Sequence, residues 1–184
     1  LWVLAAIGDG AARAIKMALR DEAEDVRLLA LRIARRHRLP VEPVVRRLVR
    51  DDSALVRREC AVSLHQLDSP QSVQLWVKLA LQHDGKDRWY LEALGIGEKG
   101  KEGACLDAWL KKAGEAWRSR AGRDIVWRSR APKAAVLLAS LLLSPEVPAA
   151  EHPRLLRSLD FHTGEQKNAA LTTLLLSDSK DNPA

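Results

Sequence analysis

Two stretches of the same pattern, Asp21-Glu22-Ala23-Glu24-Asp25-Val26-Arg27 and Asp51-Asp52-Ser53-Ala54-Leu55-Val56-Arg57, lie thirty residues apart in the sequence. Each places an aspartate five and six positions before a Val-Arg pair, and each arginine begins a run with helical spacing. A third copy follows at nearly the same step, with Asp87-Arg88 where the Val-Arg pair stood. A period of this length is typical of folds built by stacking one small unit.

The unit is predicted to be a pair of helices. Apolar residues recur at Val26, Leu29, Ala30, Ile33 and Ala34, which is the spacing of one buried helical stripe and not the alternation of a strand. Turn and capping residues separate the runs, as at Ser69-Pro70 and Asp84-Gly85. The expected helices span residues 12–19, 27–38, 41–49, 57–67, 71–81 and 88–96.

A helix pair of about thirty residues cannot bury its apolar face alone, so neighbouring pairs must stack. Such units resemble HEAT repeats, which implies an all-α fold of the α-α superhelix class, a HEAT-repeat solenoid of about five helix pairs. The period weakens past Gly95, although helical patterns continue. We therefore expect one HEAT-repeat domain over 1–184, regular over 1–97 and irregular over 98–184, and the start at Leu1 suggests an excised fragment.

The repeated charges are predicted to be structural. An arginine at the start of each second helix can reach the aspartate of a turn in its own or the next repeat, and charge-assisted hydrogen bonds of this kind would form a ladder along the stack. This interpretation is favoured over a catalytic role. The expected ladder residues are Asp21, Arg27, Asp51, Arg57, Asp87 and Arg88.

The sequence offers no residues that we assign to catalysis, to a cofactor or to a metal. The five histidines lie in five different segments, and Cys60 and Cys105 are far apart and form no CxxC pair. The letters of a dinucleotide motif occur at Gly95-Ile96-Gly97-Glu98-Lys99-Gly100, but they follow a helical pattern and not a strand. These glycines are expected to end a helix and to admit a loop.

Charge and aromatic residues suggest candidate binding surfaces. The net charge is +6, and six of the eight aromatic residues are tryptophans. Large aromatics at helical spacing usually fill a core, and basic residues at a helix end offset its dipole, so both sets have a structural alternative. No stretch is apolar for long enough to insert into a membrane. The candidate interaction surface comprises Arg35, Arg36, Arg38, Arg46, Arg47, Arg50, Trp89, Tyr90 and Trp117.

Three stretches together resemble one family of multidomain proteins. They are Asp87-Arg88-Trp89-Tyr90-Leu91-Glu92-Ala93-Leu94-Gly95-Ile96-Gly97, then Asp124-Ile125-Val126-Trp127-Arg128, then Leu155-Leu156-Arg157-Ser158-Leu159-Asp160-Phe161-His162. In this order they are similar to the HEAT-repeat segment of large secreted bacterial proteins, in which a glucose-dehydrogenase-like β-propeller precedes the repeats and a c-type cytochrome domain follows.

The resemblance implies a non-catalytic spacer or docking module of a periplasmic or secreted redox protein, with another protein or neighbouring domains of the same chain as its partners. The haem attachment motif CxxCH is absent from the sequence, so no redox residue is assigned here. The alternative is a nucleic-acid-binding HEAT-like protein, similar to DNA glycosylases with a basic groove, although acidic residues interrupt the basic field. A HEAT-type lyase or cofactor-attachment helper is a third and weaker hypothesis.

Overall fold

The computed structural model describes residues 1–65 and 67–181, and the described part of the chain contains helices and turns but no strand. The predicted all-α fold class is confirmed. The chain divides into two compact units, Leu1–Lys101 (unit 1) and Glu102–Ala184 (unit 2). Their boundary lies four residues past residue 97, where the regular part of the repeat pattern was expected to end. Each unit is described by itself.

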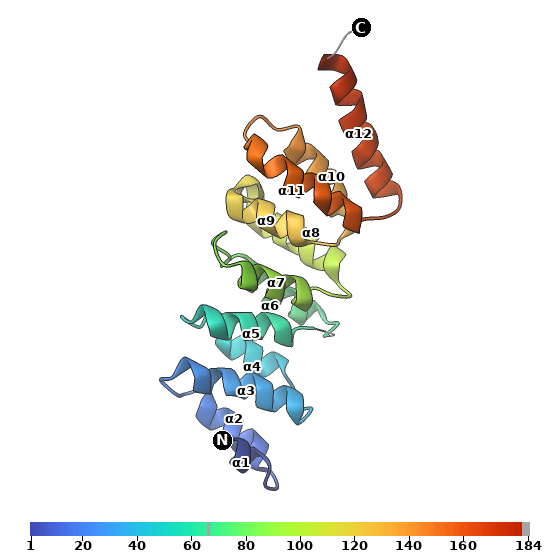
Figure 1. Cartoon of the computed structure of the whole chain (residues 1–184). Helices are drawn as coiled ribbons and strands as arrows, with labels where there is room; N and C mark the ends of the chain where they lie inside the picture. The colour runs from blue at the N-terminus through green and yellow to red at the C-terminus, as the bar shows by residue number, and fades with distance from the viewer. Residues whose placement is uncertain (66, 182–184) are drawn as a thin grey trace. The chain divides into compact units, whose positions relative to one another are not determined.

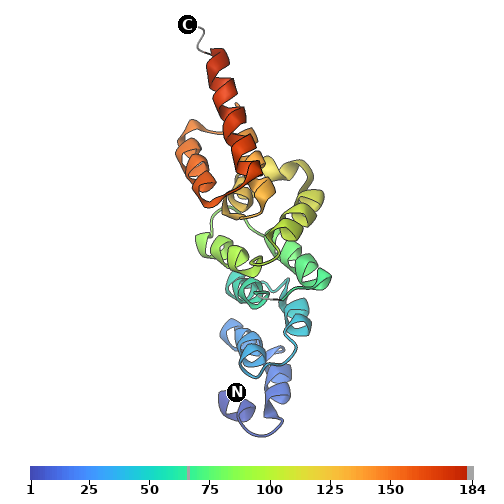
Figure 2. The same cartoon turned by 90° about the vertical axis from the view of Figure 1, so that its right-hand side faces the viewer.

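In its described residues, 1–65 and 67–101, unit 1 has a short first helix and three helix pairs (Figures 1 and 2). The helices α3, α5 and α7 contact one another in order and form one layer, while α4 contacts α6 in the other layer. Turned by 90°, the two layers appear as two columns of unit 1 (Figure 2). The helices are α1 (Trp2–Ala5), α2 (Gly10–Ala18), α3 (Glu24–Arg36), α4 (Glu42–Leu48), α5 (Ala54–Ser63), α6 (Pro70–Ala80) and α7 (Arg88–Gly97).

The predicted helix starts have a local cause in the sequence. The Ser69 hydroxyl accepts a hydrogen bond from the Ser72 amide at 3.0 Å, and the Ser72 hydroxyl accepts one from the Ser69 amide at 3.3 Å. With Pro70 at the first helical position, this capping box begins α6, as the Ser69-Pro70 pair predicts. After the C-terminal end of α7 the chain turns at Gly100, whose φ of +86° is left-handed.

The core of unit 1 lies between its two layers. Apolar side chains of both layers are fully buried there, among them Leu31, Val45, Leu75 and Leu94. Gly97 allows a close approach of α7 to α5, since a Cβ at this position would lie 2.3 Å from the Ala61 carbonyl oxygen. The second glycine of the dinucleotide-like motif is therefore a packing residue.

Unit 2 is built around α10, which packs against α8, α9, α11 and α12. The side chains that α10 buries are small or apolar, including Ala134, Ala135 and Leu138, so neighbouring helices can approach it closely. Three 3-10 turns interrupt the pairs, which explains why the sequence period is weak here. The elements are α8 (Glu102–Ala113), η1 (Gly114–Arg118), α9 (Arg120–Arg128), α10 (Pro132–Leu142), η2 (Ala149–Glu151), α11 (His152–Ser158), η3 (Leu159–Phe161) and α12 (Glu165–Asp181).

Candidate interaction surface and structural ladder

The aspartates of the first two repeats shape the turn before the second helix of each pair. Asp21 Oδ1 accepts a hydrogen bond from the Ala23 amide at 2.9 Å, and Asp51 Oδ1 accepts one from the Ser53 amide at 2.9 Å. Each carboxylate thus closes a turn two residues before the N-cap of its helix. In the third repeat Asp84 has this role, because its Oδ1 accepts from the Lys86 amide at 2.9 Å.

Arg27 joins two successive repeats. Its Nη1 donates to the carbonyl oxygens of Asp21 and Glu22 in its own turn, at 3.1 and 2.7 Å. Its Nε and Nη2 donate to the two carboxylate oxygens of Asp51 in the next turn, at 2.7 and 2.8 Å. The paired hydrogen bond from Arg27 holds the pKa of Asp51 below its ordinary value. One guanidinium therefore links the turns of two repeats, because it binds backbone carbonyls in the first turn and a carboxylate in the second.

Arg57 binds the carbonyls of its own turn as Arg27 does, but it contacts an aromatic ring and not a carboxylate in the next repeat. Its Nη1 donates to the carbonyl oxygens of Asp51 and Asp52, at 2.6 and 2.9 Å, as Arg27 does in its own turn. Towards the next repeat its guanidinium lies over the ring of Tyr90, 5.7 Å from the centroid, where a carboxylate would continue the ladder. Burial raises the pKa of Tyr90 to about 12, and its hydroxyl donates to the Leu79 carbonyl at 3.0 Å.

Asp87 and Arg88 lie in a different register from the pairs Asp21/Arg27 and Asp51/Arg57. Asp87 is the N-cap of α7, where its Oδ1 accepts from the Tyr90 amide at 3.0 Å, and it faces Arg58 of the previous repeat at 3.9 Å. Arg88 is the first residue of α7 and is exposed. Arg27 and Arg57 each lie four residues after their N-cap, and in α7 that position is the buried Leu91. The loop before α7 is also longer, since it runs from the C-cap Leu81 to the N-cap Asp87, whereas the first pair runs from Leu19 to Ala23.

Unit 2 contains a ladder contact that the sequence analysis did not identify. Arg123 Nε and Nη2 donate to the two carboxylate oxygens of Glu151 at 2.8 and 2.6 Å, while its Nη1 donates to the Arg118 carbonyl at 2.7 Å. Arg123 lies four residues after the N-cap Ser119, which is the spacing of Ser53 and Arg57. The Ser-x-x-x-Arg spacing was visible in the sequence. The contact was not predicted because only aspartate was considered as the partner of a ladder arginine, whereas the partner of Arg123 is a glutamate.

The six arginines of the candidate surface do not form one cluster. Arg35, Arg36 and Arg38 lie at the end of α3, whereas Arg46, Arg47 and Arg50 are exposed in and just after α4, in the other layer. Arg35 is also paired with Glu59 of α5. The arginines therefore belong to two different layers of unit 1, and this separation argues against a single basic groove.

The aromatic residues divide between core and surface. Trp76 is 1% exposed, its Nε1 donates to the Leu94 carbonyl at 2.8 Å, and Trp109 is also buried, as expected of core aromatics. Trp89 is 70% exposed, and Trp117 is half-buried with Arg118 stacked on its ring at 4.5 Å. Tyr90 is buried, so it does not belong to a surface with Trp89, although it is adjacent in sequence.

A groove lies where α3, α5 and α7 end, and we call it the helix-end groove. Its volume is about 380 Å³. Apolar side chains line most of it, and basic groups stand among them. Its lining residues are Arg35, Arg38, Leu39, Val41, Val62, Ser63, His65, Leu67 and Ile96.

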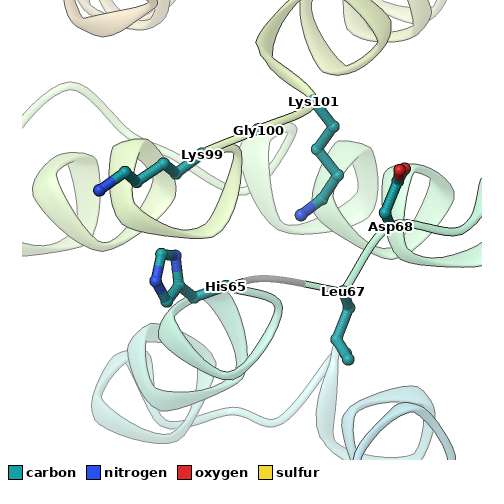
Figure 3. A pocket seen from close by; sticks show the side chains of 6 residues that line it. All are labelled: His65, Leu67, Asp68, Lys99, Gly100 and Lys101. Atoms are coloured by element: carbon teal, nitrogen blue, oxygen red, sulfur yellow. The ribbon is translucent and has the colours of Figure 1, made fainter.

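A second cavity of about 370 Å³ shares His65 and Leu67 with the helix-end groove (Figure 3). In Figure 3 the side chains of His65 and Lys99 lie on one side of it, and those of Lys101 and Asp68 lie on the other. Lys101 is buried and its ammonium donates to the Leu64 carbonyl at 2.9 Å, so it fixes the end of α5. Basic charge that faces solvent is therefore on the Lys99 side.

The described residues show no group of three or more His, Cys, Asp or Glu side chains that could hold a metal ion. Cys60 and Cys105 are both buried and are not joined by a disulfide, and burial raises the pKa of the Cys60 thiol. Nor does any helix in this part of the chain have the length and apolarity needed to cross a membrane. The contacts of the repeated charges are with turns, helix ends and neighbouring repeats.

The geometry agrees with the comparison to known proteins. Residues 11–95 match the family model of HEAT repeats, a range that covers nearly all of the three helix pairs from α2 to α7. Searches of curated proteins and of solved structures found no significant match. Residues 11–95 are therefore a HEAT-repeat segment within an all-α chain.

Proposed function

We propose that the chain is a non-catalytic scaffold that binds another protein, or a neighbouring domain of its own chain, through the layer formed by α3, α5 and α7. The observation that carries this proposal is the exposure of two large apolar side chains on α7. Trp89 is 70% exposed and Ile96 is 41% exposed. They are seven residues apart, so they lie on the same side of the helix. Exposed tryptophan is a frequent anchor of protein interfaces.

The roles of the repeated polar residues support a scaffold. Arg27, Arg57 and Arg123 donate to backbone carbonyls of their own turns, and Arg27 and Arg123 also bind a carboxylate of the following turn. Groups held in this way stabilise the stack and are not available for proton transfer. Trp89 and Ile96 add exposed apolar area to the surface of α7, which suits binding.

Oxidative footprinting with hydroxyl radicals tests the scaffold function without any mutation. The purified chain and the protein in the cells that produce it would be labelled under the same conditions, and oxidation of Trp89 would be measured by mass spectrometry. We expect Trp89 to be oxidised readily in the purified chain and to be protected in cells. The exposed Met17 of α2 serves as the control that stays reactive in both. Equal reactivity of Trp89 in both samples would contradict the proposal.

The finer proposal is that this scaffold is a spacer or docking module of a larger periplasmic or secreted redox protein. It rests on the three stretches that resemble such proteins, which form α7, the second half of α9, and α11 with η3. The coding sequence on both sides of the chain tests it. A propeller domain before residue 1 and a CxxCH motif after residue 184 are expected, and a different pair of flanking domains would refute this context while leaving the scaffold function in place.

Nucleic-acid binding is the second candidate, favoured by the exposed Arg46, Arg47 and Arg50 and by the net charge of +6. Phosphate contacts would give an affinity for duplex DNA that falls steeply as salt increases. Fluorescence polarisation of a labelled duplex measures this directly. The separation of the arginines over two layers leads us to expect no saturable binding at low salt, and a steep salt dependence would instead favour the nucleic-acid hypothesis.

A further inference from the structure

The helix-end groove combines an apolar lining with basic groups near its rim. The apolar lining includes Leu39, Val41, Val62 and Ile96, and Ile96 is also one of the two large apolar side chains that α7 exposes. We propose that the groove binds an acidic segment of a partner protein, with one apolar side chain of that segment inserted beside Ile96. This inference rests on the proposed scaffold function and names the chemistry of the partner.

The charges on the rim favour an acidic partner. Arg38 is exposed at the end of α3, and its φ of +54° directs the chain out of the helix at this point. Lys99 is exposed just after α7 and lies beside His65, whose Nδ1 donates to the Ile96 carbonyl at 3.3 Å (Figure 3). Arg35 contributes less, because Glu59 already pairs with it. Arg38 and Lys99 therefore provide the two positive charges that a carboxylate can approach.

Asp68 constrains how such a segment can lie. It is exposed on the opposite side of the adjoining cavity from Lys99 and His65 (Figure 3). A negatively charged segment would be repelled there, so its acidic residues are expected near Arg38 of the groove and near His65 and Lys99, and away from Asp68.

The dimensions favour an extended peptide over a small anionic ligand. Ile96 and Trp89 are seven residues apart on α7, a separation of roughly 10 Å at the rise of an α-helix. An extended segment covers that distance with about three residues. One segment can therefore place an apolar residue against Ile96 and still reach Trp89. Its acidic residues are expected at the Ile96 end, because Glu92 lies between the two on the same side of α7.

Fluorescence polarisation of the purified chain with synthetic peptides tests the inference. The probe is a short fluorescein-labelled peptide with a central leucine flanked by aspartate and glutamate, and the comparison peptide carries asparagine and glutamine in their place. We expect saturable binding of the acidic peptide that weakens as salt rises, because the ion pairs are exposed. Equal binding of the amide peptide would overturn the acidic class of partner.

Variants locate the binding site. The double variant Arg38→Gly and Lys99→Gln should weaken binding about tenfold, the size expected for two exposed ion pairs. Glycine is suited to the positive φ of Arg38, so this variant should fold. The matched control, Arg46→Gln with Arg47→Gln, removes the same charge from the other layer and should leave binding unchanged. Equal weakening in both variants would show a non-specific charge effect and overturn the site.

The apolar anchor has its own pair of variants. Ile96→Ser should weaken binding of the acidic peptide, whereas Leu81→Ser, at a similarly exposed position just after α6, should not. If no acidic peptide binds but Trp89 is still protected in cells, the scaffold function stands and the acidic partner is wrong. If Trp89 is not protected either, both fail.

Discussion

The guanidinium of Arg27 in α3 binds both carboxylate oxygens of Asp51, at 2.7 and 2.8 Å, across the boundary between two successive repeats. The same guanidinium holds the turn that precedes its own helix. A contact of this kind fixes the position of one turn against the next, which apolar packing between helices does not do by itself. The repeated Asp and Arg that identify the period in the sequence are thus part of what keeps the repeats in register.

Replacing Arg27 by alanine should therefore destabilise unit 1. Both Arg27 and Asp51 are partly buried, and loss of the arginine leaves the carboxylate and two carbonyl oxygens without their donor. We expect a loss of about 2 kcal/mol in the free energy of unfolding. Denaturant unfolding followed by circular dichroism measures it. The exposed Arg46→Ala should change stability by less than about 0.5 kcal/mol, and an equal effect of both variants would argue against the ladder.

Gly97→Ala should destabilise the packing of α7 on α5. The new Cβ would lie 2.3 Å from the Ala61 carbonyl oxygen, so the helices must separate, at a cost of about 1–3 kcal/mol. Gly103→Ala is the matched control within α8, since nothing lies within 4 Å of its Cβ position. That change should be neutral or stabilise the protein by roughly 0.5–1 kcal/mol. Thermal unfolding of the two variants distinguishes the outcomes, and a tolerated Gly97→Ala would contradict the close approach.

The two tryptophans Trp76 and Trp89 should respond in opposite ways to alanine. Trp76 is 1% exposed and donates to the Leu94 carbonyl, so Trp76→Ala should cost about 3–5 kcal/mol of stability. Trp89→Ala removes a side chain that is 70% exposed, and the expected change is within about 0.5 kcal/mol. Urea titrations of both variants provide the measurement. A large destabilisation by Trp89→Ala would mean that this residue serves the fold and would weaken its assignment to an interface.

His162 should make unit 2 less stable in mild acid. It is buried just before α12 with its Nε2 unpaired in the described structure, and burial, with help from Arg130 and Lys167, lowers its pKa below the ordinary value near 6.5. The unfolded chain then binds a proton more readily than the folded one, so the contribution is present above about pH 6.5 and is lost as the pH falls below it. Hydrogen exchange of α12 amides at several pH values measures the effect.

His162→Leu supplies the control for this pH dependence, because it places an apolar side chain at the buried site and removes the titrating group. The variant should show a flatter dependence of α12 exchange on pH between about 7 and 5 than the unmodified chain. His37→Gln, in unit 1, should leave the profile of α12 as it was. A slope unchanged by His162→Leu would assign the acid sensitivity to other groups.

Much of unit 1 could be predicted from the sequence, because its signals are local. The capping box at Ser69 and the helical spacing of apolar residues in α3 depend on neighbours in the chain. The third repeat was harder, since Asp87 is the N-cap of α7 and Leu91 stands where the first two repeats have arginine. No local pattern records that shift. The helix-end groove could not be predicted, because three helices from different repeats build it.

Which aromatic residues are exposed could not be predicted from the sequence either. Trp89 and Tyr90 are neighbours on α7, but consecutive residues of a helix point in different directions, so one is exposed and the other is buried. The Arg123–Glu151 contact illustrates a different limit. Its spacing from the N-cap Ser119 repeats that of Arg57 from Ser53, yet the partner is a glutamate in a 3-10 turn that no repeat pattern predicts.

The most direct test of the central claim is site-specific photocrosslinking from α7. A photoreactive phenylalanine analogue at position 89 would be activated in cells that make the protein, and the crosslinked peptides would be identified by mass spectrometry. The scaffold account predicts that position 89 crosslinks to one defined protein segment. The same analogue at position 17, which is an exposed position of α2, should not crosslink to it. Crosslinks that are absent at position 89, or that are the same at both positions, would contradict it.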